Sequence, residues 1–154
     1  MSDSNISGNI LKILGGLPEF LRRPMLKNRL MEFFSLSEQD RKETVTNALT
    51  AAPTIEFDVL ASLVKTWMQL LCEFEEDKRK AMFGTYVDVI AASPEILSKL
   101  NIDGLLSIFR SLPNDKGELL VGSFNTLMND LPADKRARVV GAIPENAKQV
   151  LRIT

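Results

Sequence analysis

The 154-residue sequence contains no histidine. This absence excludes the Ser-His-Asp and Cys-His arrangements of nucleophilic catalysis, histidine-ligated zinc and a histidine general base near neutral pH. A catalytic site built from carboxylates or lysines remains possible. There is only one cysteine, Cys72, so no disulfide can form within the chain, which is typical of a reducing compartment.

Long apolar runs are also absent, and none approaches the ~20 residues that a membrane-spanning helix needs. The first residues, Met1-Ser-Asp-Ser-Asn, carry no basic charge, so we expect no signal peptide and a cytoplasmic location. There is no glycine-rich phosphate loop either, because Gly15-Gly16 is followed by Leu-Pro and not by Lys-Ser or Lys-Thr.

Charge of either sign is nearly balanced, with 19 basic and 20 acidic residues and a net charge of −1. Strong nonspecific binding to nucleic acid requires a basic excess, so this balance argues against it, although a local basic patch remains possible. Hydrophobic residues make up 45% of the chain. This composition and length are typical of one folded domain with a substantial core.

No segment alternates apolar and polar residues over a useful length, so no strand is expected. Apolar residues recur instead at helical spacing, most densely over residues 54–74. The stripe in that segment consists of Leu60, Leu63, Val64, Trp67, Met68, Leu71 and Phe74. We predict an all-α fold of nine or ten helices in a single helical-repeat domain over residues 1–154. The segment 54–74 lies at its centre, and residues 1–8 are frayed.

Glycine and proline suggest several helix boundaries. Gly15-Gly16 should end a short helix over residues 9–14, Pro24 should begin a new helix, and Ser37 should cap the next one. Two further glycines, Gly117 and Gly122, fall inside a predicted helix and suggest close approach by a neighbouring helix. The apolar stretch 9–17 could either pack on its own chain or dock on another.

A short step precedes four of the predicted helices. It consists of an apolar residue, two or three spacers, an aspartate and a base. Its aspartates are Asp40, Asp77, Asp115 and Asp134, of which the first three are 37 and 38 residues apart and the fourth follows 19 later. This period predicts a right-handed superhelical stack, an α-solenoid of the HEAT or armadillo type. The aspartates also suit the positive end of a helix.

The last of these steps is Leu131-Pro-Ala-Asp134-Lys135. This step and the apolar residues that follow it at helical spacing resemble a known family. The segment is similar to the short helical repeats in the cytoplasmic N-terminal domain of magnesium transporters, which are related to the flagellar motor switch superhelix. Leu112-Pro-Asn-Asp115-Lys116 opens a second similar segment, so the resemblance covers residues 112–150. It implies a superhelical helix stack. It implies no magnesium site, because no acidic position here matches a metal ligand.

Few side chains suggest chemistry. The acidic residues Glu73, Glu75, Glu76 and Asp77 could bind a divalent cation, but consecutive helical positions fan out, which favours a role at the helix start. Trp67 is expected in the core, and Cys72 is expected to be a buried, inert thiol. We therefore predict no catalytic residue, no cofactor-binding residue and no metal ligand.

Basic residues form four clusters. They are Arg22-Arg23 with Lys27 and Arg29, Arg41-Lys42, Lys78-Arg79-Lys80, and Lys135-Arg136 with Arg138. In a stacked array the last three could align into a ridge that meets an acidic protein surface or a phosphate backbone. Alternatively, they are solvated charges that pair with nearby acids, as Asp77 could with Lys80 or Glu38 with Arg41 or Lys42.

The sequence as a whole favours a non-enzymatic protein-protein interaction module, a scaffold or adaptor that uses a helical-repeat surface. One alternative is a nucleic-acid-binding protein with an aligned basic ridge. Another is a regulatory domain that responds to a ligand or a metal.

Overall fold

The computed structural model describes the backbone of residues 3–153 and the side chains from Ile6 onward. Within that range the chain forms nine α-helices and two 3-10 helices and has no strand, which confirms the all-α prediction. The elements are α1 (Asp3–Gly16), α2 (Glu19–Ser35), α3 (Glu38–Ala51), η1 (Ala52–Thr54), α4 (Phe57–Glu73), α5 (Glu76–Ala92), η2 (Pro94–Lys99), α6 (Ile102–Arg110), α7 (Asn114–Asn129), α8 (Ala133–Ala142) and α9 (Glu145–Leu151).

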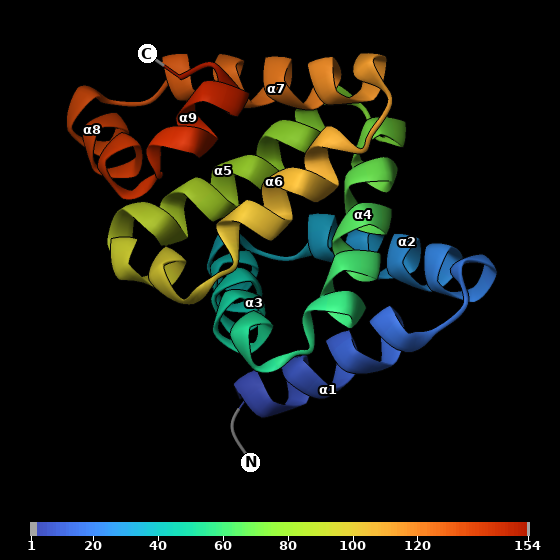
Figure 1. Cartoon of the computed structure of the whole chain (residues 1–154). Coiled ribbons are helices and arrows are strands. Elements are labelled where there is room, and N and C mark those ends of the chain that lie inside the picture. The colour runs from blue at the N-terminus through green and yellow to red at the C-terminus, as the bar shows by residue number, and fades with distance from the viewer. Residues whose placement is uncertain (1–2, 154) are drawn as a thin grey trace.

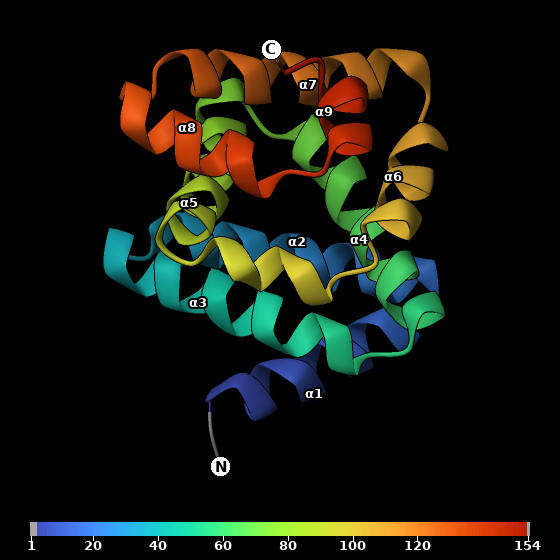
Figure 2. The ribbon, with the colours of Figure 1, turned by 60° about the vertical axis from the view of Figure 1, so that its left-hand side comes forward.

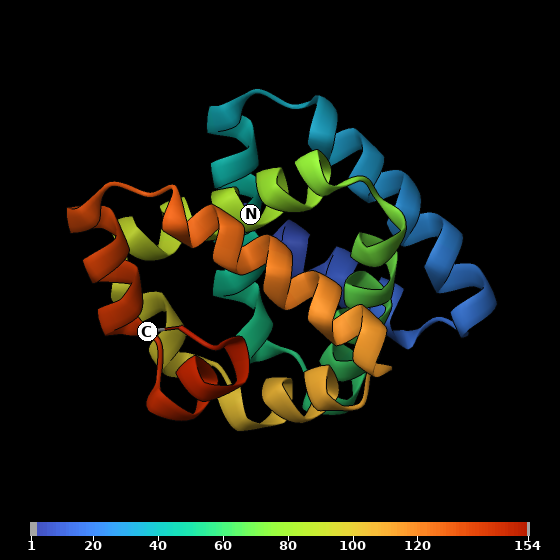
Figure 3. The ribbon, with the colours of Figure 1, turned by 90° about the horizontal axis from the view of Figure 1, so that it is seen from above.

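Most helices pack against helices two or three places further along the chain. Helix α1 packs on α3 and α4, α2 on α4, α3 on α5, and α5 on α7 and α8, whereas α1–α2 and α4–α5 contacts are sparser. Figure 2 shows the resulting layers, with α1 at one end and α7 at the other. Seen from above, α7 crosses the molecule over α4 and α5 (Figure 3), against which it packs.

Helix α4 lies between the two ends of the molecule (Figure 1), where it packs against α1, α2, α6 and α7. Its Leu70 and Leu71 are completely inaccessible to solvent, and Leu63 is buried. The prediction of a central helix in this segment is therefore confirmed. None of the helices described is long and apolar enough to cross a membrane.

The first helix is longer than predicted. Residues 3–8 were expected to be frayed but belong to α1, while residues 1–2 lie outside the described range. Helix α1 packs on α3, and this tertiary contact holds residues that look featureless in sequence. The helix ends at Gly16, as Gly15-Gly16 predicted, and an added Cβ at Gly15 would lie 2.6 Å from the carbonyl oxygen of Val59 on α4. Here glycine allows two helices to approach closely.

The second helix is continuous, so the prediction that Pro24 starts a new one is wrong. Proline lacks the amide that would bond the carbonyl of Phe20, one turn earlier. Because Phe20 is 75% exposed, water can satisfy that carbonyl instead. Ser37 caps α3 as predicted, accepting a hydrogen bond from the Asp40 amide at 3.1 Å.

The glycines that permit close approach are not the predicted ones. An added Cβ at Gly122 would meet nothing within 4 Å, and one at Gly117 would make ordinary contact with Phe109 at 3.5 Å. At Gly104, in contrast, an added Cβ would lie 2.4 Å from the ring of Phe57. A larger residue at this position would therefore force the Phe57 ring to shift.

An arginine in α2 ties that helix to α4. The side chain of Arg22 donates from Nε to Thr66 Oγ1 at 2.9 Å and from a terminal nitrogen to the carbonyl oxygen of Leu17 at 2.6 Å. The acceptors lie five residues before the arginine and 44 residues after it. One side chain thus joins the start of α2, the preceding loop and the middle of α4.

Arg79 makes the same pair of contacts 57 residues later. It donates from Nε to Ser123 Oγ at 2.9 Å, which joins α5 to α7, and from a terminal nitrogen to the carbonyl of Phe74. The separations are again 44 residues forward and five back. The arrangement of α2, α4 and the loop that precedes α2 therefore recurs in α5, α7 and the loop that precedes α5.

Candidate functional site

Large apolar side chains are exposed mainly at one end of the molecule. Six of the seven such residues lie on α1 and α2, and we call these six the α1–α2 apolar surface. They are Ile6, Ile13, Phe20, Leu21, Met25 and Met31. The seventh, Leu119, lies on α7. Phe20 is the most exposed at 75%, and Leu21 and Met25 lie beside it in the first two turns of α2.

The two helices that carry this surface have an excess of basic residues. Residues 3–35 contain five basic and three acidic residues, although the whole chain is slightly acidic. Arg23 pairs with Glu73 of α4, and Lys27 lies 3.9 Å from the same carboxylate. Within the described part of the chain, Lys12 and Arg29 have no ionic or hydrogen-bonded partner. The predicted first basic cluster therefore lies on the same helix as four of these apolar residues, and its Arg29 has no ion pair within the described chain.

The other predicted basic clusters interact largely with the protein itself. Lys42 and Lys135 approach Asp88 from two different helices, Lys42 at 4.0 Å. Lys42 also pairs with Glu38 at 3.4 Å, as predicted, and Lys80 pairs with Asp130 at 3.7 Å. These contacts agree with the interpretation of solvated charges that pair with nearby acids.

Two members of the third cluster are also engaged. The guanidinium of Arg79 is buried in the contacts described above, and the ammonium of Lys78 lies 5.1 Å from the ring centre of Phe34. A cation over an aromatic face is weakly stabilised there.

The acidic residues at the end of α4 and the start of α5 do not converge. Glu73 faces Arg23 and Lys27, whereas Glu76 accepts a hydrogen bond from Ser123 at 3.3 Å. No group of three potential metal ligands occurs among the described residues.

Cys72 is half-buried, and its thiol lies 3.8 Å from the carbonyl oxygen of Lys116, to which it can donate. Burial raises the pKa of this thiol, and the nearby charges of Lys116 and Arg79 offset the effect only in part. A raised pKa disfavours the thiolate, so Cys72 is a poor nucleophile near neutral pH.

Two cavities lie among helices α1–α6. The outer cavity, of ≈ 330 Å³, is lined by α1–α5, and the inner cavity, of ≈ 320 Å³, extends towards η2 and α6. Five residues line both cavities: Leu11, Leu26, Ala48, Trp67 and Tyr86. The sequence placed Trp67 in the core but gave no sign of a cavity, because a cavity is a deficit of packing among several helices.

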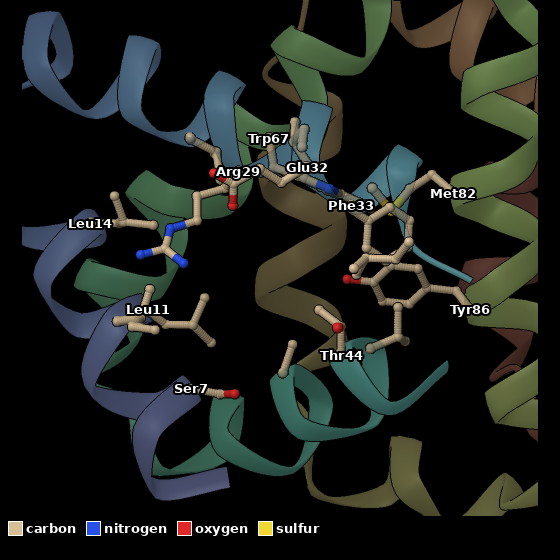
Figure 4. Close-up of a pocket in the computed structure, with 16 residues that line it drawn as sticks. Ser7, Leu11, Leu14, Arg29, Glu32, Phe33, Thr44, Trp67, Met82 and Tyr86 are labelled. Carbon is tan, nitrogen blue, oxygen red and sulfur yellow. The ribbon is translucent and has the colours of Figure 1, made fainter. Parts of the chain in front are cut away.

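Polar side chains line only part of this space. Ser7, Arg29, Glu32 and Thr44 belong to the outer cavity, and the last three are exposed. Figure 4 shows the guanidinium of Arg29 beside Leu11 and Leu14 of α1. The Tyr86 hydroxyl points into the space between the helices in the same view. Burial raises the pKa of Tyr86 to about 12, so its hydroxyl stays protonated and can donate a hydrogen bond.

Comparison with known proteins finds no counterpart for this arrangement. The resemblance of residues 112–150 to the magnesium-transporter repeats therefore stays a prediction. No known protein family, no curated protein and no solved structure matches this chain.

Proposed function

We propose that this chain is a cytoplasmic, non-enzymatic interaction module that binds an amphipathic helix of a partner protein on the α1–α2 apolar surface. The observation that carries the proposal is the concentration on these two helices of six of the seven large exposed apolar side chains in the described part of the chain. Exposed apolar side chains gathered in one region commonly mark an interaction site.

We further propose that the helices form a right-handed superhelical stack of repeats. The recurrence of the Arg22–Thr66 bond as Arg79–Ser123 supports this, because 57 residues is three times the 19-residue interval between Asp115 and Asp134. In such a stack, helices cover the apolar faces of their neighbours. Within residues 3–153, α1 and α2 lack the earlier neighbours that α3 and α4 have, which accounts for their exposed side chains.

The chemistry of the partner follows from the basic excess of α1 and α2. An apolar stripe would cover Phe20, Leu21 and Met25, and acidic side chains beside the stripe would meet Lys12, which has no ionic partner within the described chain. A second copy of this chain fits less well, since pairing two identical surfaces would bring their basic residues together. A phosphate backbone fits less well too, because it offers nothing to cover the apolar side chains.

Photocrosslinking tests this proposal. A photoreactive phenylalanine analogue is incorporated in place of Phe20 in the cells that naturally produce this protein. The crosslinked peptide is identified by mass spectrometry. The matched control places the same analogue at Leu119, the exposed apolar residue on α7. We expect a discrete adduct from position 20 alone, formed with a segment of helical apolar periodicity and net negative charge. The proposal would be overturned by an adduct between two copies of this chain or by an adduct with a basic or non-helical segment. Equal adducts from positions 20 and 119 would also overturn it.

A further inference from the structure

We infer that the two cavities together form a binding site for a long-chain carboxylate, with its alkyl chain beside Trp67 and its carboxylate at Arg29. This site lies inside the molecule, and the inference does not depend on the proposed partner helix. It rests on the volumes of the two cavities, on the position of the polar residues that line them, and on the positive charge of Arg29, which has no ion pair within the described chain.

The space has a polar end and an apolar end. Arg29, Glu32 and Thr44 are exposed and line only the outer cavity. The inner cavity is lined by aliphatic and aromatic side chains, with the Tyr86 hydroxyl and the Trp67 indole N–H as its only polar side-chain groups. The cavities share five lining residues and therefore adjoin, and in the proposed complex one ligand occupies both. A ligand with a single polar head and an apolar tail matches this arrangement.

The volumes suit an alkyl chain. Each cavity lies at the lower end of the 300–1,000 Å³ range of ligand pockets, at ≈ 330 and ≈ 320 Å³. If a methylene group occupies about the 30 Å³ of a liquid water molecule, the inner cavity holds roughly ten of them. A saturated chain of about twelve carbons therefore suits the inner cavity by volume, with its carboxylate end in the outer cavity that Arg29 lines. Filling the space with such a chain would restore the contacts that its lining residues now lack.

The head group should be a carboxylate because of Arg29. A guanidinium offers a fork of donors that matches two carboxylate oxygens, and Arg29 makes no ion pair within the described chain. Glu32, three residues later on α2, opposes an anion at the same entrance. The two residues therefore predict opposite effects on affinity when each is neutralised.

The fluorescence of Trp67, the only tryptophan, reports on the site directly. The purified chain is titrated with dodecanoate below its micellar concentration, and in parallel with 1-dodecanol and dodecylammonium. We expect a saturable spectral change with dodecanoate at an affinity at least tenfold higher than for either analogue. Arg29→Gln should remove most of that preference, and Glu32→Gln should tighten dodecanoate binding by a few fold. Arg110→Gln, at an exposed arginine of α6, is the matched control and should change nothing.

Ala48→Phe tests the location, since Ala48 lines both cavities and a larger side chain there would block the passage. We expect it to abolish the response to dodecanoate while helical circular dichroism is retained. If Ala48→Phe does not fold, the surface variants at Arg29 and Glu32 still decide the question. The inference is overturned by equal affinity for dodecanoate and 1-dodecanol, by unchanged binding in Arg29→Gln, or by the absence of a saturable response.

Discussion

Arg79 of α5 and Ser123 of α7 are joined by a buried hydrogen bond of 2.9 Å, although 44 residues separate them in the chain. Their side chains are only 6% and 1% exposed. A buried guanidinium must have its donors satisfied, so this bond fixes one relative position of the two helices. Arg22 and Thr66 do the same for α2 and α4, closer to the surface.

Removing the serine hydroxyl should therefore destabilise the fold. Ser123→Ala leaves Arg79 Nε without its acceptor in a buried site, and we expect a loss of about 1–3 kcal/mol in the free energy of unfolding. Thr66→Val should cost less, because Thr66 is buried but Arg22 is only half-buried, so its guanidinium can still be hydrated. Urea denaturation measures both losses.

Thr126→Ala is the control for these variants. Its exposed hydroxyl donates to the Gly122 carbonyl within α7, so its loss should change stability by no more than about 0.5 kcal/mol. If Ser123→Ala and Thr126→Ala lowered the free energy of unfolding equally, the hydrogen bond between α5 and α7 would contribute no more to stability than a hydrogen bond within one helix.

Two glycine substitutions should have opposite signs. Gly15→Ala places a Cβ 2.6 Å from the backbone oxygen of Val59, so α1 and α4 must move apart, at a cost of about 1–3 kcal/mol. Gly122→Ala adds a methyl group where nothing lies within 4 Å, inside a helix, and should stabilise by about 0.5–1 kcal/mol. Thermal unfolding compares the two, and a stabilising Gly15→Ala would contradict the close α1–α4 crossing.

Tyr86 should make stability fall at high pH. The unfolded chain releases the phenol proton near pH 10 and the folded chain only near pH 12, because burial raises the pKa of Tyr86 to about 12. Between these values the unfolded state binds fewer protons, so the free energy of unfolding decreases as pH rises, by roughly 2–3 kcal/mol in total.

Tyr86 is the only tyrosine, so ultraviolet absorbance follows its ionisation alone. We expect a midpoint near 12 in the folded protein and near 10 in urea. The Tyr86→Phe variant should lack this part of the pH dependence. Equal midpoints in the two states would mean that the ring is not buried as described.

Cys72 should react slowly. Burial raises the pKa of its thiol, so the thiolate that attacks an aromatic disulfide reagent is scarce at pH 8. We expect the folded protein to react at least about tenfold more slowly than the urea-unfolded chain, which also carries this one thiol. Similar rates in the two states would contradict an inert role for Cys72.

The sequence predicted the helices better than their ends. Helical periodicity is local, so the apolar stripe over 54–74 located α4 correctly. Gly15-Gly16 correctly marks the end of α1, whereas Pro24 begins no helix, because a breaker is judged from local propensity and α2 continues through this proline. The glycines of close approach could not be chosen from sequence, since the neighbouring helix is unknown there.

The candidate sites were less accessible to sequence reasoning. Apolar residues such as Phe20 and Met25 look like core residues until the structure shows that nothing covers them. The cavities depend on how five helices meet, which no single stretch encodes. One signal was available: an arginine follows Leu17 and Phe74 at the same interval of five residues, and those arginines prove to make equivalent contacts.

The most direct test of the proposed function is the dissociation constant of the partner segment that crosslinks to position 20. It is measured by fluorescence anisotropy with the labelled segment and the intact chain, folded as judged by circular dichroism. We predict that Phe20→Glu weakens binding at least tenfold, whereas Leu119→Glu leaves it unchanged and added salt weakens it moderately. Unchanged affinity in Phe20→Glu, or an equal loss in Leu119→Glu, would contradict the assignment of the α1–α2 apolar surface as the partner site.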